Sequence, residues 1–322
     1  MSQRLGVIGT FIRDTIITLD GKIVESIGGL YHTMAYLAHL VEAGTEIQPL
    51  CHVGDDFYDE LRETLARFNK NILFDTLLRV QQTNTQVKLI YRRPETRDEV
   101  TSPTMPPIRV NEITGLAGCE MVLVNLISGD DITLEALKNL HQLNPSPLIY
   151  LDLHSLALGI DEAGRRYYRG IPDWPEWVAA CDILQMNERE AATLAGVVDK
   201  QVTHDDLIKL GRRVVAEKII ACHLTLGSAG SLLFYRNKEN DVCHEHCQPL
   251  NVSQVIDVIG CGDAFGAAFV AHFMRSKNFS AATHFANKVA GLNCTFMGSL
   301  TSEIFQQVVK PQLEALPQEE PR

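Results

Sequence analysis

Gly260, Gly262 and Asp263 stand immediately before an apolar stretch and have the residue types of an anion-binding turn. Residues 264–274 contain no Asp, Glu, Lys or Arg, which predicts a largely buried helix. Glycine lets the backbone turn tightly, and the N–H groups at a helix start attract anions. A carboxylate at this place repels a bound anion, so the presence of Asp263 needs a reason. One reason is that Asp263 takes a proton from a hydroxyl that attacks a phosphate. The alternative is structural: Asp263 only favours the helix dipole.

The elements that must position this turn alternate between strands and helices. The strand-like runs are continuously apolar, as expected for a sheet covered on both faces, and lie at 5–8, 47–53, 121–125, 148–151, 183–185, 219–226 and 231–235. Helical patterns lie at 30–42, 56–69, 132–142, 188–195 and 203–217. The alternation predicts an α/β fold with one doubly wound, mostly parallel sheet.

Two stretches depart from this alternation. Residues 10–27 are rich in β-formers and contain the hairpin signal Asp20-Gly21, and residues 76–93 alternate polar and apolar. We predict a small antiparallel sheet that forms a lid from about 10–27 and 76–110, with the proline-rich residues 94–107 as a loop. The main domain, with the lid, then spans 1–316, and 317–322 form a flexible tail.

Composition limits the class of partner. The 322 residues include 29 Lys and Arg and 40 Asp and Glu, a net charge of −11, which argues against nucleic acid or an acidic membrane as the main partner. No run approaches the ~18 apolar residues of a membrane span, and the N-terminus lacks a signal-peptide core. Eight scattered cysteines are expected to be reduced, so we expect a cytoplasmic protein.

Five short motifs, in order, resemble the ribokinase-like (PfkB-type) carbohydrate kinase family over nearly the whole chain. They are Gly9 with Asp14, Gly28-Gly29 followed by 53–57, Asn187 with Glu190, the segment 225–230, and the segment 257–263. The resemblance implies a ribokinase-like fold with a lid and ATP-dependent phosphorylation of a sugar hydroxyl, with Mg²⁺ as cofactor. It also makes the lid edge a candidate surface for a homodimer.

The resemblance assigns roles by position. Asp263 is implied to be the catalytic base, and the backbone N–H groups of Gly260, Cys261 and Gly262 are implied to form the anion hole. The residues implied at the small-molecule substrate are Asp14, Gly29, Thr33 and Asp257. The residues implied at the nucleotide are Asn187, Thr225, Gly227, Ser228, Gly230 and Asn287.

Metal sites follow from the same resemblance. Glu190 is implied to act on Mg²⁺ through water. K⁺ is a further candidate cofactor, with a site formed by Asp257, Ile259, Asn293 and Gly298. Asn187 and Glu190 also fit a helix N-cap and its capping partner, and the two roles are compatible. Asn287 also fits an exposed helix asparagine.

Two departures from the family pattern concern the substrate. Thr33 and Ile12 stand where ribokinases carry asparagines, so two amides are missing from a ribose pocket. His154, after a strand end, is a candidate substrate contact or a structural residue. A nucleoside kinase is the main alternative function, and a catalytically silent regulatory relative is another. The sequence does not identify the substrate.

Residues 243–247, Cys-His-Glu-His-Cys, offer four zinc-ligand types within five positions. In an extended strand, Cys243 and Cys247 share one face while His244 and His246 point to the other. Four ligands then do not converge, so we expect reduced, metal-free cysteines here.

Overall fold

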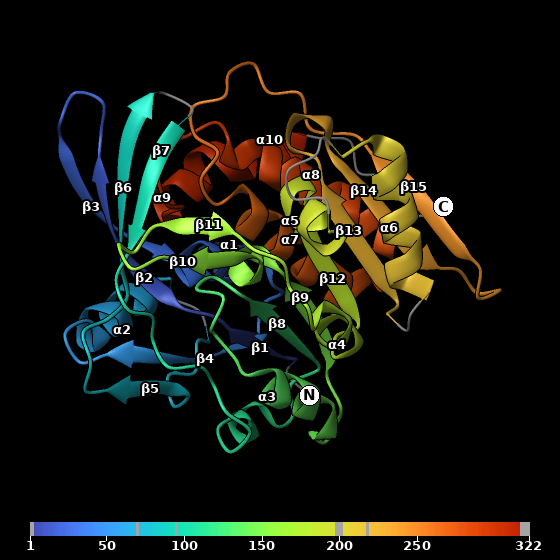
Figure 1. Cartoon of the computed structure of the whole chain (residues 1–322), viewed down its shortest axis with the longest axis horizontal. Coiled ribbons are helices and arrows are strands. Elements are labelled where there is room, and N and C mark those ends of the chain that lie inside the picture. Colours follow the sequence, from blue (N-terminus) through green and yellow to red (C-terminus); the bar gives the residue numbers. More distant parts are fainter. Residues whose placement is uncertain (1–2, 69–70, 94–95, 197–201, 217–218, 316–322) are drawn as a thin grey trace.

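A nine-stranded sheet forms the centre of the protein in the computed structural model, which describes residues 3–68, 71–93, 96–196, 202–216 and 219–315. Its strand order is β15-β14-β13-β12-β9-β8-β1-β4-β5 (Figure 1). The strands are β1 Arg4–Ile8, β4 Glu46–Gly54, β5 Leu77–Val80, β8 Met121–Asn125, β9 Leu148–Asp152, β12 Ile183–Asn187, β13 Ala221–Thr225, β14 Ser231–Arg236 and β15 Val242–Cys247. Among the described strands of this sheet, only the pairs β13–β14 and β14–β15 are antiparallel, which confirms the predicted mostly parallel sheet.

Helices cover both faces of this sheet. One face carries α1 Leu30–Leu40, α2 Tyr58–Ala66, α7 Cys261–Ser276 and α8 Phe279–Asn293, and the other α3 Leu134–Asn139, α4 Trp174–Ala179, α5 Glu188–Leu194 and α6 His204–Ala216. In β8, Met121 and Leu123 join the first core, while Val122 and Val124 join the second. Both faces are therefore dry, which explains the continuously apolar strands.

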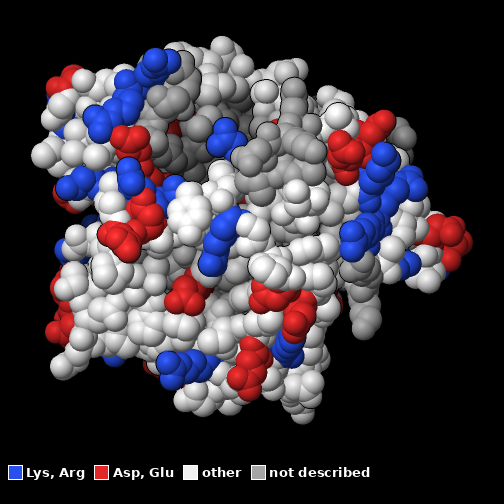
Figure 2. Space-filling view, in the orientation of Figure 1, with Lys and Arg blue, Asp and Glu red and all other residues white. Residues whose placement is uncertain are grey.

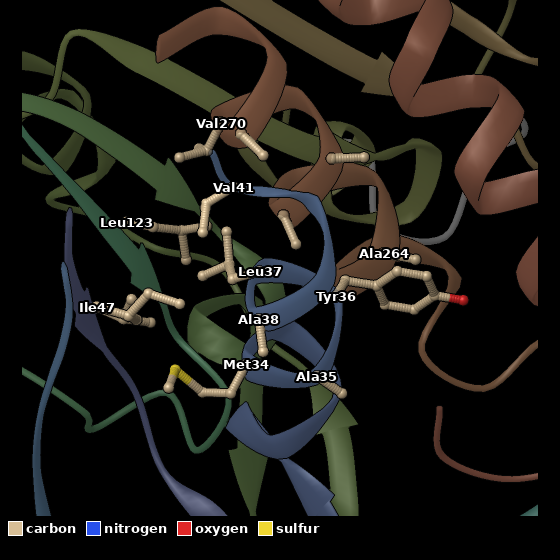
Figure 3. Packing of buried hydrophobic residues seen from close by; sticks show 14 of the residues in the cluster. Met34, Ala35, Tyr36, Leu37, Ala38, Val41, Ile47, Leu123, Ala264 and Val270 are labelled. Atoms are coloured by element: carbon tan, nitrogen blue, oxygen red, sulfur yellow. The ribbon is translucent and has the colours of Figure 1, made fainter. Parts of the chain in front are cut away.

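Helix α1 packs between the sheet and α7 (Figure 3). Leu37 is fully buried in the cluster that also holds Leu123 of β8 and Val270 of α7. A helix buried on nearly all sides has an apolar composition all round, as α1 and α7 do. This packing holds the first turns of α1 and α7 close together at the carboxyl ends of the strands.

A separate four-stranded sheet, which we call the lid, has the order β3-β2-β6-β7. Its strands are β2 Phe11–Ile17, β3 Ile23–Gly29, β6 Gln86–Arg93 and β7 Thr96–Thr101. The prediction of a wholly antiparallel lid was wrong, because β2 and β6 are parallel. The chain enters β2 from the carboxyl end of β1 and enters β6 from the carboxyl end of β5. Both lid strands therefore run away from the same edge of the main sheet, in the same direction.

Two segment boundaries also differ from expectation. Residues 96–101, predicted as loop from the flanking prolines, pair with β6 as strand β7. Residues 77–80, expected in the lid, pair with β4 at the edge of the main sheet. The predicted tail, 317–322, lies outside the described residues.

The inner face of the lid points at the main body. Ile12, Asp14 and Ile16 alternate along β2 and so share one face, and Asp14 pairs with Val87 of β6. Ile12, Val87 and Leu89 pack with Ile127 of the main body in a small apolar cluster. Asp14 therefore lies on the face of the lid that meets the carboxyl ends of the main strands.

Short elements complete the fold: β10 Leu158–Ile160, β11 Arg166–Tyr168, α9 Ser302–Ile304, α10 Lys310–Ala315 and the single-turn segments Ile113–Leu116, Leu140–Gln142, His154–Ala157, Gly227–Ala229 and Phe305–Val309. Within the described residues, no helix has the length and apolar character needed to cross a membrane. On the face shown in Figure 2, Lys and Arg are interspersed with Asp and Glu rather than gathered into a basic surface.

Candidate active site

The order of the strands reverses at β1: it pairs with β4 on one side and with β8 on the other, and later strands are added outward from both. In open α/β sheets, ligands bind outside the carboxyl ends of the strands at such a switch point. Asn125 ends β8 at this place and is 1% exposed. Sequence reasoning missed Asn125, although a polar residue that ends a buried strand was an available signal.

Asp263 lies in the first turn of α7 and is held by two side chains from other elements. Its Oδ1 accepts hydrogen bonds from Asn125 Nδ2 at 2.7 Å and from Thr33 Oγ1 at 3.2 Å. Within the described residues, no hydrogen bond reaches Asp263 Oδ2, and the buried Asn125 Oδ1 has no partner. The carboxylate therefore has one oxygen fixed by the protein and one without a hydrogen bond to the described residues.

The turn before Asp263 needs glycine at position 260. Gly260 has φ of +77°, and a Cβ there would lie 3.0 Å from His32 Nδ1. The first helical bond of α7 runs from Ala264 N to Gly260 O, so the N–H groups of Gly262 and Asp263 have no acceptor inside the helix. The N–H of Cys261 points to Val258 O at 3.4 Å. The strongest anion-binding donors of the turn are therefore at 262 and 263.

Gln185, another residue that sequence reasoning missed, links the sheet to this turn. Its Nε2 donates to Asp152 Oδ2 at 2.9 Å and to Gly262 O at 3.1 Å, and its Oε1 accepts from the Tyr150 hydroxyl. Burial, together with the nearby Glu190 and Asp263 carboxylates, raises the pKa of Asp152 well above its ordinary value. Three carboxylates thus share one poorly hydrated region.

Asn187 and Glu190 form the predicted capping box of α5. Glu190 Oε2 accepts from Asn187 N at 2.8 Å, and Asn187 Oδ1 accepts from Glu190 N at 3.0 Å. Burial raises the pKa of Glu190 to about 8. A hydrated Mg²⁺ suits this region, because Mg²⁺ prefers carboxylate oxygens and keeps several waters, and its charge favours the ionised forms of Glu190 and Asp152.

The residues predicted at the nucleotide gather at the ends of β12, β13 and β14. Thr225 pairs with Asn187 across the two strands. Gly227 and Gly230 both have positive φ, and a Cβ at Gly230 would lie 2.2 Å from Cys247 O. Ser228, between them, is exposed. The 225–230 segment is therefore a tight turn whose shape depends on its glycines.

Asn287 is buried rather than exposed on its helix. Its Nδ2 donates to Ser231 Oγ at 2.9 Å and to Cys247 O at 3.2 Å. Both donors of this amide therefore bind protein oxygens, and only its Oδ1 is left to contact a nucleotide.

The four residues predicted around K⁺ lie together and bond to one another. The Asp257 carboxylate accepts from Ile259 N at 3.0 Å and from Gly298 N at 3.2 Å. Asn293 donates to Ile259 O at 2.8 Å and accepts from the Tyr36 hydroxyl at 2.8 Å. Protein donors thus already use several of the predicted K⁺ ligands. The Asp257 carboxylate also lies near His32, and its role at the substrate stays a prediction.

His32, His154 and Arg166 lie close together near Asp263, and Arg166 reaches Glu99 of the lid. Gly28 is required because a Cβ there would lie 1.8 Å from Asp14 Oδ2. Burial lowers the pKa of both His32 and His154 despite the nearby Asp263, which favours neutral imidazoles. Figure 2 shows a hollow beside the lid.

Gly29 and Arg166 frame the same crevice. Gly29 has φ of +60° and begins α1, and a Cβ there would lie 2.4 Å from Thr10 O. Arg166 of β11 bonds Glu99 of the lid through Nε at 2.9 Å, and its buried Nη1 has no partner among the described residues. Its guanidinium therefore offers a donor near the acceptor region, which sequence reasoning did not find.

Strand β15 places Cys243, Glu245 and Cys247 on one face and the exposed His244 and His246 on the other, as predicted. Helix α8 adds a residue that sequence reasoning missed, because His284 Nε2 lies 2.8 Å from Glu245 Oε1. One ligand atom each from Glu245, Cys247 and His284 lies within 4.8 Å of the others.

Comparisons with known proteins agree with this fold. A sequence model described as pfkB family carbohydrate kinase matches residues 170–304. The comparison with curated proteins found no significant match. Solved structures share the fold over nearly the whole chain, and three of them illustrate the range of ligands.

The first is the ribokinase of Arabidopsis thaliana complexed with ribose and ATP, with 18% identity, a TM-score of 0.69, and 93% of this chain and 95% of that chain covered. The second is a nucleoside kinase of Burkholderia thailandensis in complex with inosine, with 14% identity, a TM-score of 0.69, and 92% and 90% covered. The third is a pyrophosphate-dependent kinase of the ribokinase family complexed with a pyrophosphate analogue and myo-inositol, with 18% identity, a TM-score of 0.71, and 94% and 99% covered.

These matches confirm the predicted resemblance and the ribokinase-like fold with a lid. The family match covers the segment that contains Asn187, the 225–230 turn and Asp263. It also supports the predicted enzyme class, a phosphotransferase that acts on an alcohol group.

Glu190 gives a prediction for stability. Its pKa is raised from 4.5 to about 8 in the folded protein, so between these values the folded state keeps a proton that the unfolded state has lost. The free energy of unfolding should therefore fall as pH rises from 4.5 to 8, by up to about 1.4 kcal/mol per pH unit. Denaturant titrations at several pH values from 5 to 9 should show that the free energy of unfolding changes less steeply with pH in Glu190→Gln than in wild type. Glu188→Gln, exposed on the same turn, is the matched control and should leave the slope unchanged.

We also predict that protein purified without added metal contains no stoichiometric zinc. Glu245, Cys247 and His284 supply three ligands where a structural zinc site has four, and the Glu245–His284 bond already occupies two of them. Elemental analysis of wild type checks this. Zinc at one equivalent that disappears in both His284→Ala and Cys247→Ser would contradict it.

Proposed function

We propose that this chain is an ATP-dependent kinase that phosphorylates a hydroxyl of a sugar or sugar-like compound, with Asp263 as the general base. One observation carries the proposal: Asp263 lies at the start of a helix, beside unpaired N–H groups, with Oδ1 held by Asn125 and Thr33. A buried carboxylate beside an anion-binding turn has a clear use in moving a proton during phosphoryl transfer.

The two oxygens of the Asp263 carboxylate have different roles in this mechanism. The acceptor hydroxyl approaches Asp263 Oδ2 and gives up its proton as its oxygen attacks the terminal phosphate. Asn125 and Thr33 hold the other oxygen, which keeps the carboxylate oriented. The N–H groups of Gly262 and Asp263 stabilise the negative charge on the transferred group.

We place the nucleotide along the turn 225–230 and the end of β12. Asn187, Thr225, Gly227, Ser228 and Gly230 line this path, and Asn287 contributes its Oδ1 or its packing. When bound, Mg²⁺ neutralises phosphate charge, and Glu190 would hold it through water, with Asp152 as a further carboxylate nearby. A K⁺ ion at the 257–298 loop stays a weaker proposal, since hydrogen bonds already satisfy that loop.

The acceptor is placed between Asp14 of the lid and the buried end of β8. Asp14 accepts hydrogen bonds from hydroxyls, Asn125 Oδ1 accepts another, and Arg166 Nη1 donates one. This mixture suits a polyhydroxyl compound. The missing asparagine at position 33 is partly replaced, because Asn125 brings an amide to the Thr33 hydroxyl at 3.2 Å.

A nucleoside is the second candidate acceptor. The apolar cluster of Ile12, Val87, Leu89 and Ile127 lies on the inner face of the lid and suits a flat, less polar group such as a base. A catalytically silent regulatory relative is disfavoured, because burying Asp152, Glu190 and Asp263 together is costly without a functional use.

We also propose a homodimer through the lid. Leu19, Ile23 and Val24 of the β2–β3 hairpin are 56%, 66% and 46% exposed, and β3 is an edge strand. An exposed apolar edge favours association with a second copy. A cytoplasmic location remains a proposal that rests on the cysteines, among which no disulfide is formed.

A panel of donors and acceptors tests the function. Sugars, polyols and nucleosides are offered with ATP or pyrophosphate, and phosphorylated product is measured by mass spectrometry. We expect transfer from ATP, and Asp263→Asn should lower kcat by about 10² or more while ATP binding and melting temperature stay near wild type. Asp205→Asn, exposed at the start of α6, is the control. Full turnover by Asp263→Asn would refute its role as base.

Asp14 gives a prediction for the lid. Asp14→Ala should raise the acceptor KM by about tenfold or more, because hydrogen bonds to a charged group contribute roughly 1.5–3 kcal/mol. The donor KM should change little. Asp20→Ala, in the same hairpin but exposed at its turn, is the matched control. Hydrogen exchange in β2, β3, β6 and β7 should slow when acceptor and an ATP analogue bind together. An unchanged acceptor KM would place substrate binding in the main domain alone.

A further inference from the structure

Two cysteines from different helices meet at the anion-binding turn. Cys261 begins α7 and Cys294 follows the end of α8, and their Sγ atoms lie 3.3 Å apart. Asn293 Nδ2 also lies 3.4 Å from Cys261 Sγ. Both cysteines are partly exposed, whereas five of the other six are buried and Cys243 lies on β15. This pair therefore combines mutual contact with access from solvent.

The contact is close to what a disulfide requires. A disulfide holds its sulfurs about 2.0 Å apart, so the two atoms need to approach by about 1.3 Å. The helices α7 and α8 pack on one another and supply the two sulfurs from adjoining ends, so the sulfurs are already in contact before the bond forms. In the reduced protein, a hydrogen bond between the thiols accounts for the contact.

We propose that Cys261 and Cys294 form a modification site at which a hydroperoxide produces a reversible disulfide that disables the anion-binding turn. One thiolate attacks the terminal peroxide oxygen, which breaks the O–O bond and gives a sulfenic acid and an alkoxide, or hydroxide if the peroxide is H₂O₂. The second thiol then attacks that sulfur, so the S–S bond forms and the S–O bond breaks. In total, two thiols lose two electrons and two protons, and the peroxide is reduced to water and the corresponding alcohol, or to two waters if it is H₂O₂.

The disulfide would act on the turn through its hydrogen bonds. Cys294 O accepts from Ile256 N at 2.7 Å, and Asn293 holds Ile259 O at 2.8 Å. Pulling Cys261 Sγ toward Cys294 displaces it from Asn293 and ties the first residue of α7 to this loop. The N–H groups at 262 and 263 then shift relative to the transferred phosphate, and a shift of about 1 Å at reacting groups lowers rates about 10²-fold.

Bond formation is independent of the reaction catalysed, but the loss of turnover rests on the proposed kinase function. The experiment therefore has two readouts. Reduced full-length protein is treated with H₂O₂, and the thiol-blocked digest is examined by mass spectrometry for a Cys261–Cys294 crosslink. Turnover is measured on the same samples before and after a dithiol reductant. Cys294→Ser removes the crosslink without altering a residue of the turn, and Cys243→Ser is the matched control.

We expect the crosslink in wild type and Cys243→Ser, with turnover falling at least tenfold and returning after reduction. Cys294→Ser should keep its turnover under the same peroxide dose. The proposal is overturned if Cys261 and Cys294 stay unlinked, if they oxidise separately to sulfinic acids, or if the crosslinked protein turns over normally. A mapped crosslink in protein that phosphorylates no acceptor even when reduced would support the modification site and count against the kinase function instead.

Discussion

The hydrogen bond from Asn125 Nδ2 to Asp263 Oδ1, 2.7 Å long, joins the end of a central strand to the start of a buried helix. A carboxylate in a largely dry crevice needs donors, and Asn125 and Thr33 bring them from β8 and α1. Three elements that are far apart in sequence must meet for this arrangement to exist. The packing of α1 between the sheet and α7 is what makes them meet (Figure 3).

The same crevice concentrates negative charge. Asp152 and Glu190 lie near Asp263, and burial raises the pKa of both. Gln185 and the Asn187 amide partly compensate by donating hydrogen bonds to the two carboxylates. A site of this kind is poised for a cation and a phosphate together, since each offsets the cost of burying the other's charge.

The lid completes the crevice with a different surface. It presents Asp14 among apolar side chains, while the main body presents neutral imidazoles and Arg166. The combination allows both polar hydroxyls and a less polar ring, which is why sugars and nucleosides are both candidate acceptors. At the same turn, Cys261 Sγ lies 3.3 Å from Cys294 Sγ.

Local patterns in the sequence were enough for the glycine turn before Asp263, the Asn187–Glu190 capping box and the doubly covered sheet. Each of these depends on neighbours within a few residues or on the apolar character of one strand. Gln185, His284 and Cys294 join their partners across 33 to 77 positions, so no short pattern marks them. Asn125 is marked only by its place at the end of a buried strand, and its partner Asp263 lies 138 positions away. The parallel pairing of β2 with β6 and the pairing of 96–101 with β6 likewise depend on the positions at which the chain leaves the main sheet. Long-range packing alone decides such contacts, because it sets which distant side chains share a volume and which buried polar atoms must find a partner there.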